Sequence, residues 1–132
     1  SASFPTLLDF PAPYVRTYPV YTVVAEKFEA MVKLGMANTR MKDFHDVWFL
    51  ARRFEFDRTI LRQAIEATFA RRQTNLAPSP EPLTDESAND PTKQAQWAAF
   101  LRRNGLTSAP SQFNEVVSEL RRFLGPVLQS RG

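Results

Sequence analysis

The chain has 132 residues, 43% of them hydrophobic, which is enough for one domain with a buried core. It contains no cysteine, so disulfides, thiolate nucleophiles and cysteine-based zinc sites are excluded. A net charge of +3 permits contact with nucleic acid or nucleotides without requiring it. No apolar run approaches the ~20 residues of a transmembrane helix, and the first residues do not resemble a signal peptide. We therefore expect a cytoplasmic protein with no membrane partner.

Residues 1–20 are predicted to form an extended arm or linker. Prolines at positions 11 and 13 disfavour a helix, and the aromatic and β-branched residues around them favour strand. Two short strands are barely stable without further strands beside them. Any strands formed here are therefore expected to belong to a sheet outside this chain.

Residues 21–132 are predicted to form a helical domain, and apolar residues at helical spacing indicate about five helices. The first is expected from about Thr22 to Leu34, with Gly35 closing it in a left-handed conformation. The second is expected to begin at an N-cap, Asn38 or Thr39, and to end near residue 53. Asp57 is predicted to cap a third helix.

The polar, proline-rich residues 73–90 predict a long surface loop. Asp90 followed by Pro91 is typical of a helix start, and the fourth helix is expected to end at residues 104–105. A last helix spans residues 113–128, and Gly125–Pro126 should kink it or split it. The fold class that follows is all-α with a short extended N-terminal arm.

Lys27 is a charge on an apolar helix face. At about 100° per residue it projects between Val23 and Met31, while Glu26, Glu29 and Lys33 lie on the opposite side. A charge that faces a core costs free energy of folding unless it pairs with an opposite charge or serves binding or catalysis. Two interpretations remain open: the stem of Lys27 packs on the core while its ammonium reaches water, or the ammonium binds phosphate in a cleft.

A second group of charges lies at the start of the next helix. Arg40 and Asp43 fall inside its apolar arc, and Asp46 lies at the edge, on the same face as Asp43. Two such carboxylates can accept a proton or hold Mg²⁺ bridged to phosphates. Alternatively they only complement the helix dipole, which suits Asp43 at the fourth or fifth helical position and suits Asp46 poorly. Arg40 is expected either to pair with Asp43 or to clamp an anion.

The remaining polar residues give weaker signals. His45 lies on the other side of the helix from Asp43, so a metal site built from both is geometrically poor and His45 is expected at the surface. The chain contains four arginine pairs, and the first three fit the last turns of helices, where cations favour the dipole. A collective basic face for RNA phosphates is the alternative. These pairs are Arg52–Arg53, Arg71–Arg72, Arg102–Arg103 and Arg121–Arg122. With only four glycines, no glycine-rich phosphate loop is present.

The residues around Lys27 and Asp43 resemble a known family. The segment Val-Ala-Glu-Lys-Phe-Glu-Ala at 24–30 and the segment Asn-Thr-Arg-Met-Lys-Asp-Phe-His-Asp at 38–46 are similar to the third and fourth motifs of the AbiEii/AbiGii family. These proteins are nucleotidyltransferase toxins of bacterial abortive-infection and toxin–antitoxin systems. The resemblance spans most of the chain and is less specific beyond Arg72.

The resemblance implies roles for individual residues. Lys27 would match the lysine that contacts the nucleotide triphosphate, and Asp43 the acidic residue needed for activity, which makes these two the catalytic candidates. Arg40, Lys42 and Asp46 would shape the substrate-binding pocket. Family members have an N-terminal lobe with a Gly-Ser turn and an Asp-x-Asp pair, and this pair binds the divalent metal, expected to be Mg²⁺. That lobe is missing here, so no metal ligand is assigned in this chain. The chain would then be either the C-terminal helical lobe of a longer protein, which forms one wall of a nucleotide cleft and is inactive alone, or a degenerate stand-alone relative.

The resemblance also implies partners: a nucleoside triphosphate, RNA as the acceptor, and a cognate antitoxin. The alternative from a different class is a non-catalytic helical module that binds a protein or RNA through its basic helix ends.

Overall fold

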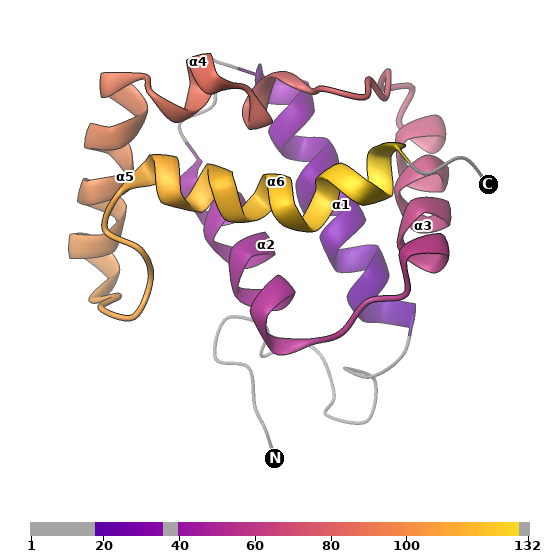
Figure 1. Ribbon diagram of the computed structural model, residues 1–132, viewed down its shortest axis with the longest axis horizontal. Coiled ribbons are helices and arrows are strands. Elements are labelled where there is room, and N and C mark those ends of the chain that lie inside the picture. Colours follow the sequence, from indigo (N-terminus) through magenta and orange to yellow (C-terminus); the bar gives the residue numbers. More distant parts are fainter. Residues whose placement is uncertain (1–17, 36–39, 130–132) are drawn as a thin grey trace.

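The computed structural model describes residues 18–35 and 40–129 (Figure 1). These residues form six α-helices and one short 3₁₀ helix, and none of them lies in a strand. In chain order the elements are α1 (Tyr18–Leu34), α2 (Met41–Arg53), α3 (Arg58–Arg71), η4 (Glu81–Leu83), α4 (Asp85–Ala88), α5 (Pro91–Asn104) and α6 (Phe113–Gln129). The all-α prediction is confirmed for this part of the chain, whereas most of the predicted arm, residues 1–17, lies outside it.

Helix α1 begins earlier than the sequence suggested. It starts at Tyr18 rather than at Thr22, so the prediction of extended structure up to residue 20 is wrong for its last three residues. Pro19 is the second helical residue, a position that tolerates proline because the N–H groups of the first turn have no partner within the helix. At the other end, Gly35 has a φ of +58°, which confirms the predicted left-handed ending.

Helix α2 starts later than predicted and α3 starts as predicted. Arg40, not Thr39, occupies the N-cap position of α2, and the proposed caps Asn38 and Thr39 lie outside the described residues. The helix ends at Arg53, in agreement with the sequence. Asp57 is confirmed as the N-cap of α3, because its Oδ1 accepts a hydrogen bond of 2.9 Å from the backbone N–H of Ile60.

Residues 73–90 match the predicted surface loop only in part: residues 73–80 form no helix or strand and are mostly exposed or half-buried, whereas the rest is largely helical. They contain η4 and the single turn of α4, whose N-cap Thr84 accepts a hydrogen bond from the Ser87 N–H. Leu83 and Ala88 are buried, and both short helices pack against α6. Two apolar residues among many polar ones were too few to show in the sequence pattern, yet their burial holds the segment on the domain.

Helix α5 begins with Asp90 as N-cap and Pro91 as first helical residue, and it ends before Gly105, whose φ is +60°; both ends were predicted. Helix α6 runs continuously through Gly125–Pro126, so the predicted split does not occur. Near its end, the Arg62 Nη1 donates to the backbone carbonyls of Val127 and Leu128 at 3.0 and 2.5 Å. This arginine supplies donors for helix-end carbonyls that have none within the helix.

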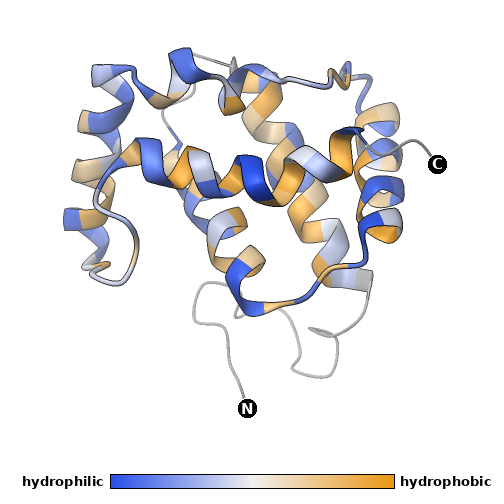
Figure 2. Ribbon diagram, viewed as in Figure 1, coloured by the Kyte–Doolittle hydropathy of each residue, from blue (hydrophilic) through white to orange (hydrophobic). Residues whose placement is uncertain are grey.

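The helices pack around one core. α1 packs against α2 and α3, while α6 packs against α2, α3, α4 and α5; Figure 1 shows α3 and α5 at opposite ends of α6. The apolar residues at helical spacing on α6 are buried, and the ribbon of this helix alternates between hydrophobic and hydrophilic bands in Figure 2. These residues are Phe113, Val116, Val117, Leu120, Leu124, Val127 and Leu128. No helix in the described ranges has both the length and the apolar character to cross a membrane.

Candidate functional site

The five residues singled out in the sequence lie together where α1 meets the start of α2. The Lys27 Nζ lies 3.0 Å from Asp46 Oδ2 and 3.7 Å from Asp43 Oδ1. The Arg40 Nη2 lies 3.5 Å from Asp43 Oδ2, and the Lys42 Nζ donates to Asp46 Oδ2 at 2.7 Å. We call these five residues the α1–α2 charge cluster. Its geometry joins two sequence segments that are about a dozen residues apart.

Asp46 is the centre of this cluster. Its side chain is only 1% exposed, and it accepts from Lys27 and Lys42 at Oδ2 and from the neighbouring His45 at Oδ1. Burial by itself would raise the pKa of Asp46, but the hydrogen bonds from His45, Lys42 and Lys27 outweigh it and lower the pKa from 3.8 to about 2. The carboxylate is therefore ionised at neutral pH, and it is the anion that holds the two lysines together.

Asp43 lies in the first turn of α2, and one of its carboxylate oxygens accepts no hydrogen bond from the described residues. It is the third residue of α2, earlier than the fourth or fifth position predicted, and a carboxylate in this first turn favours the helix dipole. Its side chain is 3% exposed. Among the described residues, no group donates a hydrogen bond to its Oδ2, the atom that faces Arg40. A buried carboxylate oxygen of this kind is able to accept a hydrogen bond from a ligand hydroxyl.

The cations of the cluster reach the surface, and the carboxylates lie beneath them. The exposed fraction of the side chain is 21% for Lys27, 58% for Lys42 and 63% for Arg40. The ammonium of Lys27 thus contacts two carboxylates and its side chain is partly exposed, while binding of phosphate by this ammonium stays a prediction. Three cations face two carboxylates, so the cluster carries an excess of one positive charge. That excess favours an anionic ligand such as a phosphate.

Two residues expected on the surface are buried instead. His45 packs among Trp48, Phe49, Trp97 and Phe100, because α5 covers the side of α2 that a wheel of α2 alone places in solvent. Glu29 is buried on the side of α1 that faces α3, where it accepts a hydrogen bond of 2.5 Å from the Thr74 hydroxyl. Both helices are covered on two sides, which the pattern of a single helix cannot reveal.

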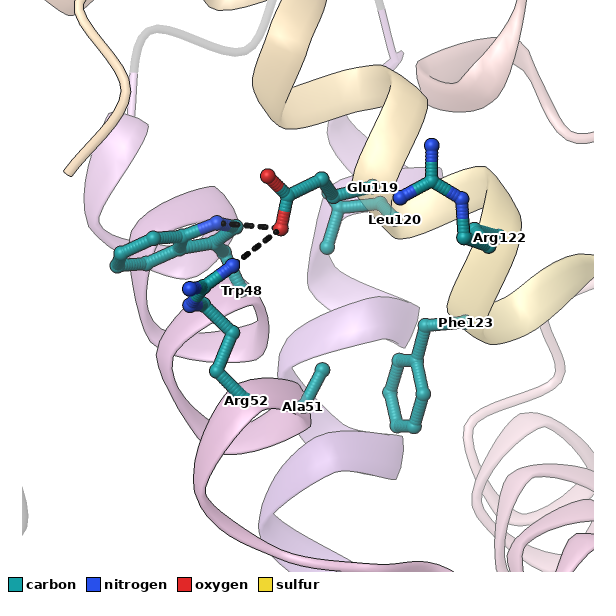
Figure 3. A pocket seen from close by; sticks show the side chains of 7 residues that line it. All are labelled: Trp48, Ala51, Arg52, Glu119, Leu120, Arg122 and Phe123. Atoms are coloured by element: carbon teal, nitrogen blue, oxygen red, sulfur yellow. Dashed lines mark hydrogen bonds and ion pairs between the residues drawn. The ribbon is translucent and has the colours of Figure 1, made fainter.

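A pocket lies away from the charge cluster, between α2 and α6. Figure 3 shows the residues that line it: Trp48, Ala51, Arg52, Glu119, Leu120, Arg122 and Phe123. There the Trp48 Nε1 and the Arg52 Nη1 both donate to Glu119 Oε1, at 3.0 and 3.2 Å. These interactions join the middle of α2 to α6, and none of the lining residues belongs to the charge cluster.

The arginine pairs are engaged largely in ion pairs. Arg52 pairs with Glu119, Arg71 and Arg72 pair with Glu26, and Arg121 pairs with Asp85. The first three arginine pairs lie at the ends of α2, α3 and α5, as the dipole interpretation requires, whereas Arg121–Arg122 lies in the middle of α6. Contact between these arginines and RNA phosphates stays a prediction.

The residues that the structure describes do not fit a metal ion by themselves. Within the described ranges, no three His, Cys, Asp or Glu side chains are grouped so that they could hold one. The two aspartates of the cluster contact cations instead, and a cation at Asp46 would have to displace two lysines. The Mg²⁺ implied for the family therefore has no binding set in these residues.

Comparison with known proteins identifies the family. The family model of the nucleotidyl transferase AbiEii toxin of type IV toxin–antitoxin systems matches residues 1–119. The chain belongs to this family. Membership implies a nucleotide substrate and an antitoxin partner, and it confirms the resemblance seen in the two AbiEii motifs around Lys27 and Asp43. No curated protein and no solved structure matches the chain.

Proposed function

We propose that this chain is the helical lobe of an AbiEii nucleotidyltransferase of the bacterial cytoplasm and that the α1–α2 charge cluster forms one wall of its nucleotide cleft. The observation that carries the proposal is the arrangement of the cluster. Its three cations lie at the surface above two buried carboxylates and exceed them by one charge. An ammonium held in this way is suited to the negative charge of a triphosphate.

In this proposal Lys27 neutralises the triphosphate, while Arg40 and Lys42 contact it from the rim. Asp46 does not touch the substrate and keeps Lys27 in place. The contacts support this division, because both oxygens of Asp46 already have partners in His45, Lys27 and Lys42. The side chains of the three cations are 21% to 63% exposed.

Asp43 is proposed to act on the attacking hydroxyl, which an RNA end would supply. The oxygen of that hydroxyl forms a bond to the α-phosphorus of the nucleotide, the bond from this phosphorus to the bridging oxygen breaks, and pyrophosphate leaves. The hydroxyl proton passes to Asp43 Oδ2, the atom that accepts no hydrogen bond from the described residues. Residues 18–35 and 40–129 hold no set of ligands for Mg²⁺. The metal-binding carboxylates are therefore proposed to lie on a second, N-terminal lobe.

The first test is the coding sequence upstream of Ser1. The proposal expects a Gly-Ser turn followed by an Asp-x-Asp pair there. If that region encodes neither, the proposed cleft lacks its metal site, and the alternative of a non-catalytic helical module gains support.

The decisive experiment measures nucleotidyl transfer in the protein that carries both lobes. Lys27→Met keeps the length of the side chain without its charge, and we expect its KM for the nucleoside triphosphate to rise about tenfold or more. Asp43→Asn keeps the shape of the side chain without its basicity, and we expect kcat to fall by about 10² or more. Lys33→Ala, on the exposed side of the same helix, is the matched control and should behave as wild type.

Circular dichroism on each variant separates loss of fold from loss of function. Folded variants of Lys27 and Asp43 with wild-type kinetics would refute the cleft assignment. Folded variants with the expected losses would establish it, and the same assay run with a panel of RNA ends would define the acceptor.

A further inference from the structure

We propose that His45 is a positioning residue that fixes the Lys27 ammonium through the Asp46 carboxylate. The effect of this positioning on catalysis rests on the proposed function, whereas the structural link between His45 and Lys27 does not. The link runs from an imidazole buried on α2, through a carboxylate on the next residue, to an ammonium on α1.

The orientation of the imidazole is fixed by packing. Four aromatic rings surround it: Trp48 and Phe49 from α2, and Trp97 and Phe100 from α5, with ring centroids 5.7 to 6.4 Å away. The Phe49 ring lies within 21° of the imidazole plane and stacks on it. Because the side chain is also buried, the imidazole has little freedom to turn away from its polar partner.

The polar partner determines which nitrogen carries the proton. The His45 Nδ1 lies 3.1 Å from Asp46 Oδ1, and an ionised carboxylate is only an acceptor. The Nδ1 must therefore be protonated and donate to Oδ1. This donor is fixed by its surroundings, whereas the two lysines are flexible.

The two oxygens of Asp46 serve different partners. Oδ1 accepts from His45, while Oδ2 faces Lys27 at 3.0 Å and Lys42 at 2.7 Å. With Oδ1 held by a rigid donor, the carboxylate plane cannot rotate, and Oδ2 stays directed at Lys27. Without that donor the carboxylate is free to turn, and Lys27, which is 21% exposed, can leave for solvent.

The chemical reactivity of Lys27 tests the link without any activity assay. His45→Phe fills the aromatic cage without a donor, and we expect reductive methylation of Lys27 to become about tenfold faster, the factor for loss of one charge-assisted hydrogen bond. His45→Asn places an amide N–H where Nδ1 was and should restore a rate within about threefold of wild type. Lys33, exposed on the same helix, reports general changes and should keep its rate in both variants. A folded His45→Phe variant with the wild-type rate at Lys27 would overturn the proposal.

The wild-type protein provides a test that does not depend on a variant folding. Nitrogen-15 NMR of the imidazole distinguishes its two tautomers. We expect a proton on Nδ1 at neutral pH, whereas an imidazole protonated only on Nε2 could not donate to Asp46 and would refute the link.

Kinetics then test the catalytic consequence. In the protein with both lobes, His45→Phe should raise the KM for the nucleoside triphosphate about tenfold and leave kcat nearly unchanged, and His45→Asn should reverse this change. A normal KM in a His45→Phe variant whose Lys27 has become reactive would overturn the consequence for catalysis. If Lys27→Met itself has normal kinetics, the proposed function fails, while the reactivity and NMR results still decide whether His45 positions Lys27.

Discussion

Helix α1 carries two charged clusters that differ in charge balance. The α1–α2 cluster sets Lys27, Arg40 and Lys42 against Asp43 and Asp46 and has one excess positive charge. Facing α3 lies a second group, the α1–α3 charge cluster, in which Glu26 and Glu29 meet Arg71 and Arg72 and the charges cancel. Both clusters join α1 to another helix, so the presence of ion pairs does not separate a site from a structural contact.

The two clusters also differ in where their carboxylates lie. Both aspartates of the α1–α2 cluster are buried, whereas in the α1–α3 cluster Glu29 is buried but Glu26 is 28% exposed and its arginines are about half exposed. A surface pair contributes little to stability, because water competes with it and two long side chains must be ordered. Buried anions beneath accessible cations, with positive charge in excess, are what distinguish the candidate site. Four predictions test this comparison.

The largest effect is expected on stability. Asp46→Ala removes the acceptor of a buried imidazole N–H and the partner of two lysines, and it should lower the free energy of unfolding by about 3 kcal/mol. Glu26→Ala, in the α1–α3 cluster, should lower it by less than about 1 kcal/mol. Urea denaturation of both variants measures the difference. Equal losses would mean that the two clusters do not differ energetically.

The second-largest effect is expected in acid, which should weaken the contribution of the α1–α2 cluster to the stability of the fold. Because the pKa of Asp46 is lowered from 3.8 to about 2 in the folded protein, the unfolded chain binds the proton more readily. This carboxylate therefore stabilises the fold by about 2 kcal/mol above pH 4–5, and that contribution is lost as the pH falls through 3.8 toward 2. Urea denaturation of the wild type and of Asp46→Asn between pH 2 and pH 6 should show the stability gap closing with acid; a gap that stays constant would contradict the assignment.

Ligand binding should depend on one cluster only. Calorimetric titration with a nucleoside triphosphate at low ionic strength should give about tenfold weaker binding for Lys27→Ala, which corresponds to about 1.4 kcal/mol. Arg72→Ala removes a cation from the neutral α1–α3 cluster and should change the affinity less than about twofold. If the two variants weaken nucleotide binding to the same extent, the expected difference between the two clusters is contradicted.

The smallest effect is expected for the exposed pair between Glu26 and Arg71. A double-mutant cycle of Glu26→Ala and Arg71→Ala should give a coupling free energy of about 0.5 kcal/mol at low salt. At 1 M salt the screening length is about 3 Å and most of that coupling should vanish. A coupling of several kcal/mol that resists salt would place this pair among the buried interactions.

Much of the fold was readable from local signals. Asp57, Asp90, Gly35 and Gly105 all end or begin helices where predicted, because caps and left-handed glycines act within one turn of the chain. The errors occurred where local signals were weak or conflicting: Pro19 at the start of α1, and the segment around Leu83 and Ala88, which is held by contacts with α6.

The candidate site was predicted only in part. The sequence selected Lys27, Arg40, Lys42, Asp43 and Asp46, and the structure brings all five together. The sequence did not predict the burial of His45 and Glu29, which were expected in solvent. Each lies on a helix covered by a second neighbour, α5 in one case and the end of α3 in the other, and a helical wheel identifies one apolar face without counting the helices that will pack on it.

By itself, the sequence determined the five long helices, most of their ends, the family and the charged residues that do not suit a core, because these depend on periodicity, on capping within a turn and on short motifs. Only the tertiary structure decided how those charges combine. The Lys27 ammonium contacts Asp46 because α1 packs against α2, and the His45 imidazole beside Asp46 is buried because α5 packs against α2. Distances between side chains on different helices depend on this packing, and no local pattern contains them.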